Sequence, residues 1–129
     1  MTTKCRLATI LLMVSACALS GFGASDCESL SNLKLPDTQV TSAVSVPAGG
    51  PVSIRAANGN SQQISDLPAF CRVAVTLAPT SDSDIKVEVW LPATTWNGKF
   101  QAVGNGGWAG SIVYTALSDA LRQGYAAAR

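Results

Sequence analysis

Two runs of alternating apolar and polar residues, separated by a short polar connector, constrain the fold of this chain most. Every second residue of 70–77 and of 85–91 is aliphatic or cysteine, which is the period of a strand with one face on a core. Residues 79–84 have the length of a hairpin loop, so we predict two antiparallel neighbouring strands. Lys86 and Glu88 fall on the opposite face of the second strand, which we expect to face solvent.

A third strand and a glycine-rich loop are predicted to follow this pair. Asn97-Gly98 indicates a turn, and residues 99–103 form a short strand that runs into residues 104–110, whose sequence is GNGGWAG. Apolar residues at helical spacing then begin at Val113. The sequence therefore predicts the order strand, glycine loop, helix.

Residues near both ends of this helix suggest how it is bounded. Thr115 is a candidate cap at its start, and Gly124 suits the left-handed position after its last turn. Residues 125–129 begin another apolar segment, for which we predict no partner element.

The part of the chain before residue 70 gives weaker signals. Residues 26–68 are rich in Ser, Pro, Gly, Asn and Asp, and residues 39–46 form the one clear extended run. Turns are indicated at residues 47–51 and at Asn58-Gly59. We expect loops and short strands here.

The N-terminus has the layout of a secretory signal peptide. Residues 1–6, which include Lys4 and Arg6, precede an apolar run, residues 7–19, and small residues that suit cleavage, so we assign residues 1–25 to the signal. The run is shorter than the ~20 residues that span a bilayer, which disfavours a permanent anchor helix. We expect a secreted or periplasmic protein. A lipoprotein anchored at Cys17 is the alternative.

Charge argues against two classes of partner. Removing Lys4 and Arg6 with the signal leaves seven of the nine basic residues against eight acidic ones, so the formal charge changes from +1 to −1. A nearly neutral surface without a basic stripe is not expected to bind nucleic acid or anionic lipid. Membrane contact is expected only through the leader or a lipid on Cys17.

The cysteines predict a disulfide. Cys5 and Cys17 lie in the leader, which leaves Cys27 and Cys71 as a pair in a chain bound for an oxidising compartment. A metal pair is the competing interpretation. Two sulfurs without histidine or C-x-x-C spacing make a poor zinc site, so we predict no metal site.

The glycine loop admits three interpretations. Backbone N–H groups that glycine leaves uncrowded can bind the phosphate of a dinucleotide or the oxyanion of an ester-hydrolysis intermediate. Gly104, Gly106 and Ala109 fit a loose G-x-G-x-x-A pattern, but the preceding antiparallel strands argue against the dinucleotide. A plain tight turn that lets the helix pack closely on the strand remains open.

Four ordered motifs resemble one family. Residues 67–73 read LPAFCRV, residues 85–92 IKVEVWLP, residues 96–100 WNGKF and residues 103–110 VGNGGWAG. Together they resemble the N-terminal part of the tannase and feruloyl esterase family over residues 27–125. The resemblance implies an α/β fold, the N-terminal portion of an α/β-hydrolase with an incomplete sheet, and hydrolysis of hydroxycinnamic, gallic or related aromatic esters.

The resemblance also implies roles for particular residues. Gly106 and Gly107 would supply second oxyanion-hole donors, and Cys27 and Cys71 match the family's N-terminal disulfide. The family's calcium site would lie in a lid outside this chain, so no cofactor is expected in the chain itself. The partner would be a small aromatic ester bound by the complete enzyme.

Departures from the family decide what this chain can do alone. The family's nucleophilic serine in a C-S-x-G-G context, its later aspartate and its histidine have no counterpart here, and the chain has no histidine. Ser111 and Ser118 are not in a nucleophile-elbow context, and Asp119 is expected on the surface. We expect residues 26–129 to be an inactive N-terminal part that stops before the nucleophile. The alternative is a small exported non-catalytic β-rich binding module.

Overall fold

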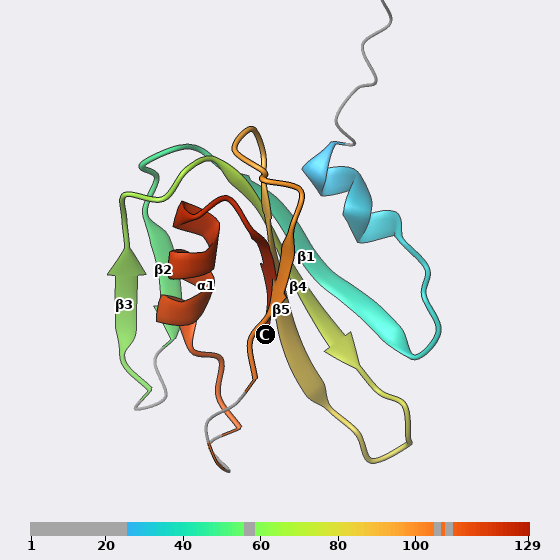
Figure 1. The fold of residues 1–129 in the computed structure, drawn as a ribbon. Coiled ribbons are helices and arrows are strands. Elements are labelled where there is room, and N and C mark those ends of the chain that lie inside the picture. Colours follow the sequence, from blue (N-terminus) through green and yellow to red (C-terminus); the bar gives the residue numbers. More distant parts are fainter. Residues whose placement is uncertain (1–25, 56–58, 105–106, 108–109) are drawn as a thin grey trace, which may run out of the picture.

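The computed structural model describes residues 26–55, 59–104, 107 and 110–129, so the predicted signal peptide lies outside the described residues. A 3₁₀ helix and one α-helix accompany seven strands in this part of the chain (Figure 1). The elements are η1 (Cys27–Asn32), β1 (Thr38–Val46), β2 (Val52–Arg55), β3 (Ser61–Ile64), β4 (Phe70–Leu77), β5 (Ile85–Pro92), β6 (Phe100–Ala102), α1 (Tyr114–Arg122) and β7 (Ala126–Ala128).

Most of the strands form one mixed sheet in the order β1-β4-β5-β7-β6. The predicted hairpin is confirmed: β4 and β5 are antiparallel, with Phe70 opposite Pro92 and Leu77 opposite Ile85. β1 extends the sheet on the other edge of β4, also antiparallel. The remaining pair, β2 and β3, forms a separate antiparallel hairpin.

The prediction that residues 125–129 lack a partner is wrong. Ala126–Ala128 forms β7, which inserts between β5 and β6, antiparallel to the first and parallel to the second. The strand β6, the helix α1 and β7 thus form a parallel crossover unit, in which the helix returns the chain to the sheet. The side chain of Ala127 is fully buried, and its small size suits a position beneath α1.

The two faces of the sheet are covered by different elements. In Figure 1, α1 and the β2-β3 hairpin lie on one side of the sheet and η1 lies on the other. The larger core cluster lies under α1 and the hairpin and contains Val52, Ile54, Leu67, Phe70, Trp90, Leu117, Ala120, Leu121 and Ala127. A smaller cluster of Cys27, Ala43 and Val73 lies under η1.

This arrangement overturns the solvent assignment of Glu88, although Lys86 is exposed as predicted. Glu88 retains only 6% of its accessible surface, because its face of β5 is the one that α1 and the hairpin cover. Trp90, two residues further along the same face, is fully buried.

One of the two predicted boundaries of α1 is confirmed, and the other is wrong. Gly124 has φ +79°, the left-handed conformation expected after the last turn. The candidate cap Thr115 is wrong: the helix begins after Val113, and no side chain caps it. Thr115 lies inside the first turn, one residue after Tyr114, so its hydroxyl is past the capping position.

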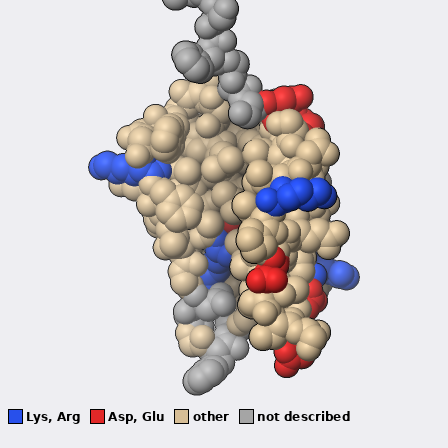
Figure 2. Space-filling model, turned by 90° about the vertical axis from the view of Figure 1, so that its right-hand side faces the viewer, with Lys and Arg blue, Asp and Glu red and all other residues tan. Residues whose placement is uncertain are grey.

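Figure 2 shows one face on which Lys, Arg, Asp and Glu lie scattered among uncharged residues. Within the described ranges, no helix is both long and apolar enough to span a membrane.

Candidate functional site

The glycine loop joins β6 to α1, in the order that the sequence predicts. Gly107 and Gly110 both have positive φ, +64° and +56°, and a Cβ added to either would meet no atom within 4 Å. Glycine is therefore required at these positions by the backbone conformation and not by crowding. Gly106, the other candidate oxyanion donor, lies outside the described residues.

One arginine contacts both ends of the glycine loop. Arg129 Nη1 donates to the carbonyl oxygen of Gly104 at 2.7 Å, and its Nε donates to that of Ser111 at 3.3 Å. The backbone of Arg129 exchanges two hydrogen bonds with Glu88, 2.7 and 3.0 Å long. The loop ends are thus tied to the residue that follows β7, and through it to β5.

A buried polar cluster lies around Glu88. Its carboxylate accepts hydrogen bonds from Arg72 Nε (2.8 Å) and Nη2 (2.6 Å), from Trp90 Nε1 (2.8 Å) and from the hydroxyl of Tyr114 (2.9 Å). Arg72 Nη1 donates to the carbonyl oxygen of Ser53 at 3.0 Å. Three elements, β4, β5 and α1, therefore meet at one carboxylate, and Arg72 links β2 to them.

The ionisation of this cluster suits a structural role. The hydrogen bonds with Glu88 raise the pKa of Arg72, although burial opposes them. Burial, with the nearby Glu88 charge, raises the pKa of Tyr114, so the phenol remains a neutral donor. Across the described ranges, no buried side-chain nitrogen or oxygen lacks a hydrogen-bond partner. The cluster is a hydrogen-bonded network with every buried polar atom satisfied, and it joins elements of the fold.

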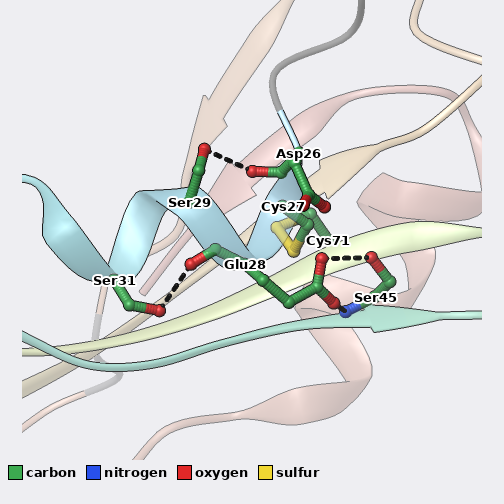
Figure 3. The surroundings of a disulfide bond; sticks show 7 residues. All are labelled: Asp26, Cys27, Glu28, Ser29, Ser31, Ser45 and Cys71. Carbon is green, nitrogen blue, oxygen red and sulfur yellow. Dashed lines mark hydrogen bonds between the residues drawn. A yellow bond between two sulfur atoms is a disulfide. The ribbon is translucent and has the colours of Figure 1, made fainter.

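The predicted disulfide is present. Cys27 and Cys71 are bonded, with Cα atoms 5.6 Å apart, and they join η1 to β4 (Figure 3). Beside the bond, the Glu28 carboxylate accepts from Ser45 N–H at 2.9 Å and from its hydroxyl at 3.2 Å (Figure 3). These contacts fix η1 on the sheet at two points.

The Glu28 contact has a defined pH dependence. The Ser45 N–H, followed by the hydrogen bond with Asp26, lowers the pKa of Glu28 to about 2 from its ordinary 4.5. A carboxyl whose pKa is lowered by folding stabilises the native state above its ordinary pKa. The part of this contribution that comes from Ser45 is therefore present at neutral pH and is lost as the pH falls from 4.5 toward about 2. The part that comes from Asp26 is offset, because the same contact raises the pKa of Asp26.

The serines near the loop lack the setting of a nucleophile. The hydroxyl of Ser118 donates to the carbonyl oxygen of Tyr114 at 2.8 Å, within the helix, and Ser118 is buried. Asp119 is exposed, as predicted, and pairs with Arg122 at 3.2 Å. The described residues contain no group of three metal-ligating side chains. With no histidine in the sequence, neither serine has an ordinary general base.

Sequence reasoning missed the Glu88 cluster and the Arg129 contacts. A signal for the first was available: Trp90 shares a strand face with Glu88, and a tryptophan on a face assigned to solvent indicates that another layer covers it. No signal marked Arg129, because its contacts depend on where β7 enters the sheet.

Comparison with known proteins shows which family this sequence and fold resemble. Residues 71–129 match the family described as tannase and feruloyl esterase. An uncharacterized esterase of Xanthomonas campestris pv. campestris is 41% identical over 118 residues, covering 92% of this chain and 20% of that protein.

Two solved structures from Aspergillus oryzae share the fold. An esterase superposes with a TM-score of 0.69 and 31% identity, over 79% of this chain and 21% of that one. Feruloyl esterase B superposes with a TM-score of 0.64 and 36% identity, over 79% and 20%. The chain thus spans about a fifth of the length of these relatives. By its sequence and its fold, it belongs to the tannase and feruloyl esterase family.

Proposed function

We propose that this chain is the N-terminal part of an exported, serine-type carboxylic ester hydrolase with an α/β-hydrolase core, acting on feruloyl, galloyl or related aromatic esters. One observation carries the proposal: the glycine loop lies between a strand and a helix in a fold that the chain shares with two esterases of known structure. The name of the feruloyl esterase among them supports the aromatic ester as substrate class.

In this proposal the loop stabilises developing charge. The N–H groups of Gly106 and Gly107 donate to the oxyanion that forms when the serine attacks the ester carbonyl. Loss of one such donor typically costs about 3 kcal/mol in the transition state. The serine, its histidine base and the aspartate that orients the histidine come from outside these residues, since the chain has no histidine. A calcium site, if the complete enzyme has one, lies outside them too.

The disulfide supports export. A bond between Cys27 and Cys71 persists in oxidising compartments and is rare in the cytosol. Together with the signal-like residues 1–25, it favours a secreted or periplasmic location, with lipidation at Cys17 as the alternative. Mass spectrometry of the mature N-terminus distinguishes cleavage from lipidation.

We predict that the exported, purified chain does not hydrolyse methyl ferulate or methyl gallate above background. The chain has no histidine to act as the general base. The measurement is chromatographic detection of released acid, with feruloyl esterase B of A. oryzae as the positive control. Release of acid above background by the homogeneous chain would show that the catalytic groups have been assigned wrongly.

The coding sequence after Arg129 separates the esterase from a non-catalytic module. The esterase requires a downstream C-S-x-G-G segment, followed by an aspartate and a histidine. A stop codon directly after Arg129 would instead favour the exported binding module.

A further inference from the structure

The two ends of the glycine loop converge on one guanidinium group. Gly104 and Ser111 flank the loop, and their carbonyl oxygens accept from Nη1 and Nε of Arg129 at 2.7 and 3.3 Å. The guanidinium is planar and its donors have fixed relative directions, so it sets the separation of the two carbonyls as well as binding them. The two residues that flank the loop are therefore joined by the side chain of the residue that follows β7.

The backbone of Arg129 is itself held by β5, at the buried residue Glu88. Its N–H donates to the Glu88 carbonyl at 3.0 Å, and the Glu88 N–H donates to the Arg129 carbonyl at 2.7 Å. The Glu88 side chain accepts from Tyr114, the first residue of α1, at 2.9 Å. The loop is thus fixed at its two ends by Arg129, and the helix that follows it is fixed by the residue paired with Arg129.

We propose that Arg129 is a positioning residue for the glycine loop, because it holds the two flanking residues, Gly104 and Ser111, at a fixed separation. The catalytic meaning of this proposal rests on the proposed function, because it requires that the loop supply the oxyanion donors. Donors of this kind act only when they are held in place before charge develops, so loosening the loop ends weakens catalysis without removing any donor.

Lysine can replace arginine in this role only in part. A lysine ammonium is a single point donor on a flexible stem, and it cannot hold two carbonyls at a fixed separation. Arg129→Lys retains the positive charge and should restore the loop only in part. Arg129→Met removes all donors and keeps an apolar stem of similar length.

The first measurement is hydrogen–deuterium exchange in the exported, purified chain and does not depend on activity. In Arg129→Met, the peptide that covers residues 104–113 should exchange about tenfold faster, while β4 and β5 keep their protection. Arg129→Lys should fall between. Arg122→Met is the matched control, because Arg122 is exposed and pairs with Asp119 on the helix surface, and it should leave the loop unchanged.

Two results would overturn the proposal. One is unchanged exchange of residues 104–113 in Arg129→Met. The other is an equal rise in β4, β5 and the loop in both Arg129 variants, which would make Arg129 a residue for global stability only.

The second measurement tests the catalytic consequence in an intact enzyme. Residues 26–129 replace the corresponding segment of feruloyl esterase B from A. oryzae, and methyl ferulate is the substrate. If the hybrid is active, Arg129→Met should lower kcat at least about tenfold and change KM less than about twofold. Equal losses in Arg129→Met and Arg122→Met would reject the positioning role. A hybrid that folds, as circular dichroism shows, but is inactive would count against the proposed function instead. The exchange experiment would still test the contact with the loop.

Discussion

Replacement of Arg72 by methionine will lower the free energy of unfolding by about 3–5 kcal/mol, because it leaves a buried carboxylate without its counter-ion. The Glu88 side chain is 7% exposed and is bonded by Arg72 through two nitrogens at 2.8 and 2.6 Å. Trp90 and Tyr114 still donate to it in the variant, but neither carries charge. The loss is far larger than the ~0–1 kcal/mol typical of an exposed pair.

Urea denaturation followed by tryptophan fluorescence measures this loss, since Trp90 lies in the cluster. Arg122→Met is the control: it removes the same functional group from an exposed pair with Asp119 and should cost under about 1 kcal/mol. If the two variants lose equal stability, the Glu88 cluster does not stabilise the fold as strongly as we expect.

Removal of the disulfide is the second large effect. Replacing both Cys27 and Cys71 with serine should cost about 4 kcal/mol, as the chain-entropy relation gives for a loop of this size. The bond closes a sequence separation of 44 residues and joins η1 to the sheet. The double replacement avoids leaving a single thiol that could couple two chains.

The same denaturation experiment, with and without dithiothreitol, checks this prediction. The reductant should lower the unfolding midpoint of the unaltered chain to that of the double variant, and it should have no effect on the variant. Limited proteolysis should then cut first between η1 and β1, because the remaining anchors of η1 are the Glu28 to Ser45 contacts and the packing of Leu30. A midpoint that reductant leaves unchanged would contradict the expected contribution of the bond.

The strands could be predicted because their signal is local. Alternation with a period of two located β4 and β5, and the connector between them indicated the antiparallel pair. The cysteine pair followed from chemistry and compartment, without any geometry. Gly124 was predictable because a left-handed residue after a helix is a backbone requirement that glycine meets at low cost.

The errors arose where a residue's environment depends on segments far away in the sequence. Glu88 was assigned to solvent because alternation shows that the two faces differ, but not whether a second layer covers the polar one. The segment Ala126–Ala128 had no predicted partner, since a strand that inserts between β5 and β6 is set by the path of α1. The Arg129 contacts follow from that insertion and carry no sequence signature of their own.

The most direct test of the central claim is a crystal structure of a complete esterase that carries this segment, inactivated at its serine by an aryl phosphonate. The phosphonyl oxygen then occupies the place of the oxyanion. We predict the N–H of Gly107 within about 3 Å of that oxygen, beside the N–H of the residue that follows the nucleophile. A Gly107 N–H bonded to a protein carbonyl and remote from the phosphonate would contradict the account.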